Sequence, residues 1–165
     1  MTKKECFSCR GMFPDIEGPV HRYMDSSAGC WAKYGEILAR EYSDPVFFET
    51  HRLTVDVYAA QHPRSKSRQN IQSVGLHLVR ICLLLEHGLD AENANEAMLE
   101  AGKNKASFTF LTPPADLGAI TVENFSAAKT TEQHITLVRE WAKCVWDAWE
   151  IHHDTIRTWL PNKYT

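Results

Sequence analysis

Two cysteines near the start of the chain, Cys6 and Cys9 in the stretch CFSCRG, are the first residues whose type and spacing could support chemistry. A Cys-x-x-Cys pair occurs in metal-binding turns and in thioredoxin-like redox sites. The redox site normally has a helix that starts at the first cysteine, whereas Gly11 and Pro14 follow this pair at once. The pattern therefore favours a metal site, with unligated packing cysteines and a redox pair as the alternatives.

The segment that follows offers two further ligands, His21 and Cys30. The full pattern is then Cys-x2-Cys-x11-His-x8-Cys, a Cys3His set suited to tetrahedral zinc. Cys30 lies in the first turn of an expected helix, where the positive end of the helix dipole stabilises a thiolate. We predict a closed, structural zinc site formed by Cys6, Cys9, His21 and Cys30.

Histidines on the expected helices form a second candidate site. Metal ligands in helical bundles come from facing helices, so imidazoles aimed at one interior predict a shared polar or metal site. Its candidate members are His51, Asp56, His62, His77, His152 and His153. An open coordination position at such a site would allow catalysis through a bound water. The alternative is that each histidine is a buried or helix-terminal residue with its own hydrogen-bond partner.

The elements that must position these residues are mostly helices. Apolar residues at three- and four-residue steps predict helices within 26–43, 43–63, 67–89 and 131–160, and a shorter helix over 90–102. Ser26 or Ser27 and Asp44 are the expected N-caps, with Pro45 at the first helical position. Only the stretch FTFLT, residues 108–112, alternates like a strand.

Residues 1–29 differ from the rest of the chain, because they are rich in glycine and proline and show little periodicity. Such a segment needs an ordering agent, which a structural metal can supply. We therefore predict a mainly α fold, a bundle of about four principal helices with a small N-terminal zinc-binding lobe. The chain is expected to be a single domain, 1–165, with the lobe (1–29) packed on the bundle (30–165).

The composition is that of an ordinary globular protein, with 44% hydrophobic and 24% charged residues. The formal net charge of -3 gives no electrostatic reason to expect nucleic acid or an anionic membrane as partner. The sequence has no apolar run of about 18 residues and no signal-peptide hydrophobic region, which predicts a cytoplasmic protein. Five cysteines, an odd number, argue against a disulfide framework. Cys82 and Cys144 are expected to pack as small apolar residues.

Several strings resemble one bacterial family of uncharacterised proteins that is catalogued only as a domain of unknown function. The strings are CFSC, GPVHRYMDSSAGCW, HRLTVDVYAAQHP, SVGLHLVRICLLLEHG and WAKCVWDAWEIHH. Members of that family pair a Cys-x-x-Cys lobe with a Gly-Cys-Trp motif, a VDxYAxQHP helix and a terminal WAxxVWxAWxxHH helix. The resemblance transfers no activity, and it implies motif positions for Cys6, Cys9, His21, Cys30, His51, Asp56, His62, His77 and His153.

Two functions are expected from these patterns. The first is a bacterial zinc-binding protein with a structural zinc and a histidine-lined interior that binds a ligand or a second metal. The alternative is a metal-dependent enzyme, a hydrolase or thiol transferase, that uses the bundle histidines. The histidine distribution is similar, at the level of fold, to damage-inducible helical bundles and to mycothiol- or bacillithiol-dependent transferases, although the lobe and the QHP helix depart from their pattern. A small-molecule or protein partner is not identified, and the tryptophans of the last helix could be buried within the chain or in a homodimer.

Overall fold

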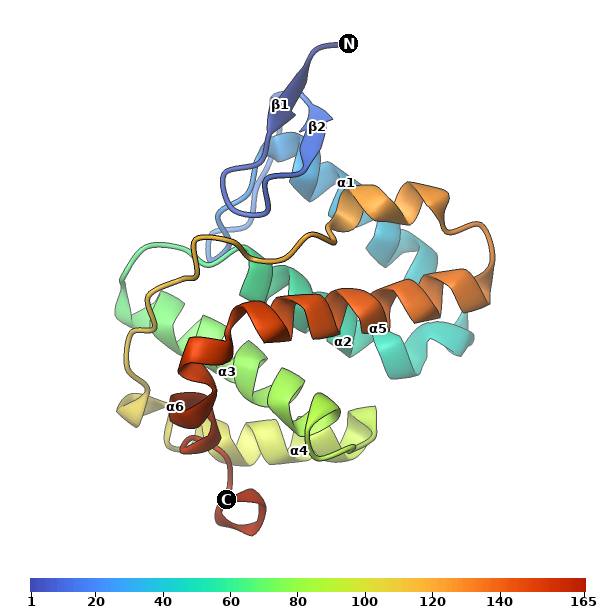
Figure 1. Cartoon of the computed structure of the whole chain (residues 1–165). Coiled ribbons are helices and arrows are strands. Elements are labelled where there is room, and N and C mark those ends of the chain that lie inside the picture. The colour runs from blue at the N-terminus through green and yellow to red at the C-terminus, as the bar shows by residue number, and fades with distance from the viewer.

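Five helices form the body of the molecule, and the structure, a computed structural model, describes residues 1–165. They are α1 (Ala28–Tyr42), α2 (Phe48–Gln61), α3 (Arg68–Leu85), α4 (Ala91–Gly102) and α5 (Thr131–Ala148). Helices α2, α3 and α5 pack against one another, α4 packs on α3, and α1 contacts both α2 and an N-terminal hairpin (Figure 1). The prediction of a mainly helical fold is confirmed.

Polar caps fix where the first two helices begin. Ser27 Oγ accepts the Cys30 N–H at 3.3 Å, which starts α1. Asp44 accepts the Val46 N–H at 3.0 Å and begins a 3-10 turn, Pro45–Phe47, that leads directly into α2. Both side chains supply acceptors for N–H groups that a helix start otherwise leaves unpaired. The expected caps are therefore confirmed, and they set the positions of Cys30 and of the α2 residues.

The N-terminal lobe contains a small hairpin, which the sequence reasoning did not expect. Strands β1 (Lys3–Glu5) and β2 (Met12–Pro14) pair antiparallel, with Lys4 opposite Phe13. Three residues per strand are too few to show an alternating pattern, which explains why the sequence signal was absent. Phe13 is buried against the helical body, whereas its neighbours in β2 are exposed. The hairpin lies at one end of the molecule (Figure 1). The buried Phe13 side chain attaches it to the helical body.

The stretch at residues 108–112, which alternates like a strand, forms no strand in the structure. It runs as a single connection and buries Phe108 and Leu111, which are three positions apart. The Phe108 ring stacks on Trp159 with ring centroids 4.4 Å apart. Gly75 of α3 leaves the space for this ring, because a Cβ at that position would lie 2.5 Å from it. The burial in this segment therefore does not follow the alternating pattern that suggested a strand.

The last helix is shorter than the predicted 131–160. Helix α5 ends at Ala148, a 3-10 turn follows, and a short helix α6 (His153–Arg157) takes a new direction (Figure 1). The break carries the Trp149 side chain into the core, where its Nε1–H donates to the Ala60 carbonyl at 3.1 Å. A buried indole N–H needs such a partner, and this bond links the end of α5 to α2. Tertiary packing therefore overrides a helical pattern that continues in the sequence.

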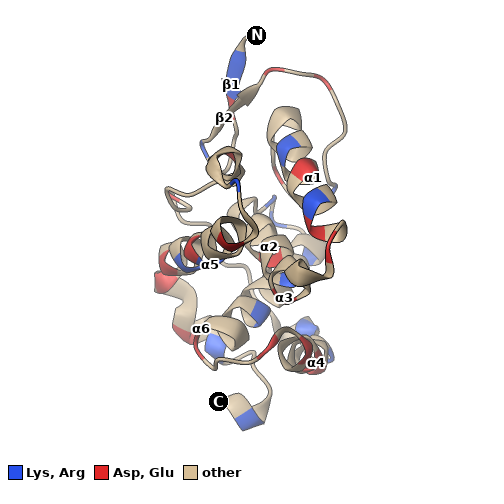
Figure 2. Cartoon of the chain, turned by 90° about the vertical axis from the view of Figure 1, so that its right-hand side faces the viewer, with Lys and Arg blue, Asp and Glu red and all other residues tan.

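One hydrophobic core extends through the lobe and the helical body. Its largest fully buried side chains include Trp141, Trp149, Tyr58 and Phe108. Lys and Arg alternate with Asp and Glu along α1 and α5, so neither helix presents a stripe of one charge (Figure 2). None of the helices combines the length and the apolar character that crossing a membrane requires.

Candidate metal centre

Three cysteines and one histidine converge where the hairpin meets the helical body. The ligand atoms of Cys6, Cys9, Cys30 and His62 all lie within 4.8 Å of one another, and all four residues are buried. The Sγ atoms of Cys9 and Cys30 are 3.9 Å apart, and His62 Nε2 lies 3.3 Å from Cys30 Sγ. A Cys3His set at this spacing matches the donor types and the compactness of a tetrahedral metal site. This cluster could hold a metal ion.

The turn of the hairpin supplies the first two sulfurs. The Cys6 N–H donates to the Gly11 carbonyl at 2.9 Å, and the Arg10 N–H donates to the Cys6 carbonyl at 3.1 Å. Arg10 has a φ of 62°, in the left-handed region that closes tight turns. Gly11 lies so close to Phe13 that a Cβ would sit 2.7 Å from its ring. The turn therefore needs Gly11, and it brings Cys6 and Cys9 to the same side.

The third sulfur belongs to the first turn of α1. Ser27 caps this helix, and Cys30 follows in the position where N–H groups of a helix start face the side chain. Gly29 lies directly under β2, since a Cβ there would overlap the Pro14 carbonyl oxygen. The glycine lets the strand lie on the helix start, which brings Cys30 to the hairpin sulfurs.

His62 provides the nitrogen from the end of α2, and its hydrogen bonds prepare it for a metal. His62 is the C-cap of α2, and its Nδ1–H donates to the Tyr58 carbonyl at 2.7 Å. The Nε2 lone pair is then free and faces Cys30. Metal-binding histidines are commonly held in this way, with the other ring nitrogen hydrogen-bonded. The Tyr58 ring also stacks on the His62 ring, with centroids 4.0 Å apart.

Tyr58 contacts a sulfur as well as the imidazole. Its hydroxyl lies 3.4 Å from Cys30 Sγ, and its ring also stacks on Tyr34 with centroids 3.8 Å apart. Burial raises the pKa of Tyr58, so the hydroxyl keeps its proton and can donate to a thiolate. Tyr58 thereby supports both Cys30 and His62 from the side of the helical body.

The three sulfurs are strongly coupled electrostatically. Hydrogen bonds from Cys30 and Cys9 lower the pKa of Cys6, whereas the contact with Cys6 raises the pKa of Cys30. Cys9 has its pKa raised to about 12, because its contact with Cys6 and its burial outweigh the lowering effect of its hydrogen bond with Cys30. Three buried sulfurs this close together cannot all be thiolates unless a cation compensates them. The cluster therefore has the electrostatics of a cation site.

His21, the predicted fourth ligand, is not part of the group. Its Nδ1 accepts the Tyr23 N–H at 3.2 Å, which places the ring proton on Nε2 and leaves neither nitrogen free for a metal. Its ring packs beside Trp31 with centroids 5.5 Å apart, and burial, followed by charge on His77, lowers its pKa. The structure thus keeps the predicted Cys3His chemistry but replaces His21 with His62.

Sequence reasoning placed His62 in the second site because it shares a face of its expected helix with His51, and it lies 32 residues beyond Cys30. Ligand spacing along a chain indicates which residues are near in sequence, and it does not show which helix end meets a hairpin. The one available signal was the Gln-His-Pro string itself, because the residue before a proline tends to end a helix.

The other candidates of the second site occupy separate networks. Asp56 is fully buried and accepts two hydrogen bonds from Arg80, both at 2.7 Å, and one from His77 Nδ1 at 2.8 Å. His152 Nε2 donates to the Thr112 carbonyl at 2.7 Å. His153 Nε2 donates to the Trp146 carbonyl at 2.9 Å.

His51 belongs to a buried network that sequence reasoning missed. Its Nδ1–H donates to Glu41 at 2.8 Å, and the same carboxylate accepts His134 Nε2–H at 2.8 Å and the Thr54 hydroxyl at 2.7 Å. Glu41 ends α1 with a fully buried side chain, in a position that looks like a solvated helix end in the sequence. The bundle histidines are therefore individually hydrogen-bonded, and the structure does not assemble them into one ligand set.

Comparison with protein families gives one match. The model of a family of unknown function (DUF5946) matches residues 4–150. The chain belongs to this family. The resemblance drawn from the motifs is thereby confirmed, and all four residues of the metal-binding group lie inside the matched part of the DUF5946 chain. Neither the curated proteins nor the solved structures yield a match.

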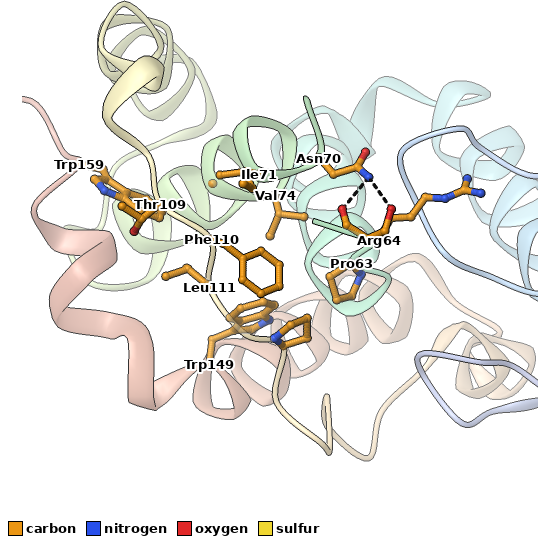
Figure 3. A pocket seen from close by; sticks show the side chains of 13 residues that line it. Pro63, Arg64, Asn70, Ile71, Val74, Thr109, Phe110, Leu111, Trp149 and Trp159 are labelled. Carbon is orange, nitrogen blue, oxygen red and sulfur yellow. Dashed lines mark hydrogen bonds between the residues drawn. The ribbon is translucent and has the colours of Figure 1, made fainter. Parts of the chain in front are cut away.

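This DUF5946 protein also has a small cavity next to the metal-binding group (Figure 3). It has a volume of about 20 Å³, and its lining includes Pro63, the residue after His62. Phe110 and Trp149 form much of its apolar wall. At the polar end, Asn70 donates to the carbonyl and hydroxyl oxygens of one serine at 2.8 and 3.5 Å. With these polar atoms already paired, the cavity offers no group for chemistry.

Proposed function

We propose that this protein is a zinc-binding helical protein in which Cys6, Cys9, Cys30 and His62 hold one structural Zn²⁺. The observation that carries the proposal is the convergence of these four buried donors, with His62 already in the tautomer that leaves Nε2 free. Thiolate and imidazole donors in a Cys3His set are typical of structural zinc. All four positions are taken by the protein, so the ion would have no open site for a substrate.

The role of the ion would be to fasten the lobe to the helical body. Two ligands come from the hairpin turn, one from the start of α1 and one from the end of α2. Strands of three residues cannot form a stable hairpin by themselves. In small zinc domains the metal supplies roughly 10 to 16 kcal/mol of apparent binding free energy, which is coupled to folding. All five cysteines are free, as thiolate ligation requires, and we propose the cytoplasm as a matching reducing location.

Metal analysis of the purified protein tests the proposal. We expect one zinc per chain in the wild type and in Cys144→Ser, and less than one tenth of that in Cys9→Ser. Cys144 lies outside the cluster and serves as the matched control. Purified protein without metal, which also fails to bind added Zn²⁺, would refute the proposal.

A second pair of variants tests the identity of the fourth ligand. We expect His62→Ala to lose zinc and His21→Ala to retain it. Cobalt substitution gives an independent readout, because the absorption of Co²⁺ reports how many thiolates and imidazoles bind it. Loss of zinc in His21→Ala together with retention in His62→Ala would restore the ligand set predicted from spacing and exclude the one proposed here.

A further inference from the structure

We propose that a second site for a divalent metal of the Zn²⁺, Co²⁺ or Ni²⁺ class lies at the end of α3, formed by Cys82, Glu86, His87 and His153. This group, the α3-end cluster, is remote in sequence from the Cys3His group and shares no residue with it. The proposal is thus independent of the structural zinc. It uses two elements of the sequence, the string CLLLEHG and the terminal His-His, that the structural site leaves without a role.

Three of the donors already lie together. A ligand atom from each of Cys82, Glu86 and His87 falls within 4.8 Å of the other two. Cys82 Sγ lies 3.5 Å from Glu86 Oε2, one helical turn further along. Cys82 is fully buried while His87 is exposed, so the cluster runs from the core to the surface and is open to an ion from solvent. One sulfur, one carboxylate and one imidazole are donors that borderline divalent metals accept together.

His153 adds a fourth donor from α6, and its hydrogen bond fixes which nitrogen is free. The Nε2–H donates to the Trp146 carbonyl at 2.9 Å, and the ring stacks on the Trp146 indole with centroids 3.8 Å apart. The lone pair of the neutral ring is then on Nδ1, which lies 4.0 Å from Glu86 Oε1. Glu86 Oε1 also accepts hydrogen bonds from Arg157 at 2.8 Å and from Trp146 Nε1 at 3.2 Å. Nitrogen and oxygen are both metal ligand atoms, so one divalent ion that displaces Arg157 could bind the two together.

The position also favours a positive charge, because Glu86 caps the C-terminal end of α3, where the helix dipole is negative. Arg157 supplies that charge in this structure, with hydrogen bonds to Glu86 at 2.9 and 2.8 Å. Its side chain is 45% exposed and has a second partner in Asp154 at 2.8 Å. An incoming ion would replace one cation by another. The Arg157 guanidinium would stay with Asp154, and the Cys82 thiol would lose its proton to solvent as the metal–sulfur bond forms.

Titration of the zinc-loaded protein with Co²⁺ tests the site. We expect one Co²⁺ per chain in addition to the one Zn²⁺, with a thiolate-to-cobalt charge-transfer band. Cys82→Ser and His153→Ala should weaken cobalt binding by more than about tenfold, since even outer-shell changes at metal sites cost about 10- to 100-fold. The controls are Cys144→Ser and His152→Ala, because neither residue belongs to the cluster. Both variant proteins should bind Co²⁺ like the wild type.

Removal of the competing cation gives a second readout with the opposite sign. Arg157→Gln should tighten cobalt binding by about 2- to 5-fold, the range that corresponds to breaking a partly exposed ion pair. His87→Ala, at an exposed position, replaces Cys82→Ser as the loss variant if the serine protein does not fold. The proposal would be overturned if no second ion binds at millimolar Co²⁺. It would also be overturned if His87→Ala and His153→Ala bind Co²⁺ with the affinity of the wild type.

A variant of the Cys3His group separates the failure of this proposal from that of the proposed function. Cys9→Ser should lose zinc and still bind cobalt at the α3-end cluster. If it instead loses the cobalt band that Cys82→Ser retains, the cobalt was in the Cys3His group. That result would overturn the second site while it supports the first.

Discussion

The buried ion pair between Asp56 of α2 and Arg80 of α3 allows a quantitative prediction. The side chains are 0% and 8% exposed, and two hydrogen bonds of 2.7 Å join them. Asp56→Asn keeps the size of the side chain and removes its charge, which leaves the Arg80 guanidinium buried without a counter-charge. Breaking a buried pair in this way costs about 3 to 5 kcal/mol. For a protein of this size the melting temperature should fall by about 6 to 20 °C.

Urea unfolding, followed by circular dichroism, measures this loss, and a double-mutant cycle assigns it to the pair. Arg80→Met should also destabilise the protein, because it leaves the buried Asp56 carboxylate without its guanidinium and with only the His77 hydrogen bond. The cycle consists of Asp56→Leu, Arg80→Met and the variant with both substitutions, which should lose much less than the sum of the two single losses, since apolar replacement of both partners removes the desolvation cost. A loss below about 1 kcal/mol in Asp56→Asn, or additive losses in the double variant, would refute the reasoning.

Three further predictions follow from the same packing. Gly29→Ala should displace β2 through overlap with the Pro14 carbonyl, lower zinc content and cost at least about 1 to 3 kcal/mol, while Gly35→Ala in the same helix meets no atom within 4 Å and should leave zinc content unchanged. Glu41→Leu should cost about 1 to 3 kcal/mol in urea unfolding, because it leaves the buried His134 Nε2–H without an acceptor, whereas the Thr54 hydroxyl can still donate to the Thr50 carbonyl; a loss near zero would contradict this. Removal of zinc with a chelator should make the hairpin the first segment cut in limited proteolysis, as identified by mass spectrometry; unchanged cleavage sites would contradict a fastening role for the ion.

Local chemistry made the helices and three of the four metal-binding residues predictable. Ser27 and Asp44 indicate helix starts, because their side chains accept hydrogen bonds from N–H groups two or three positions further along the chain. Cys6, Cys9 and Cys30 could be assigned together because a turn and a helix start are also local features. Each of these predictions depends on residues that are close in the sequence.

Contacts between distant segments could not be predicted in the same way. His62 meets Cys30 only because β2 lies on the start of α1 while the end of α2 arrives from the other side. Glu41 and His134 are 93 residues apart, and nothing near either one in the sequence marks it as half of a buried pair. The break after Ala148 likewise depends on the carbonyl of Ala60, which the apolar pattern of α5 does not reveal.

The position of His62 in the sequence determines when, during synthesis of the chain, the metal site can be completed. A nascent chain presents Cys6, Cys9 and Cys30 well before His62, so an early ion could bind three sulfurs but would lack its last ligand until α2 is complete. Closure of the cluster would then join the two ends of a segment that runs from residue 6 to residue 62, as a cross-link does, and so reduce the entropy of its unfolded state. The hairpin, although it is made before α1 and α2, would be among the last parts of this half of the molecule to be secured.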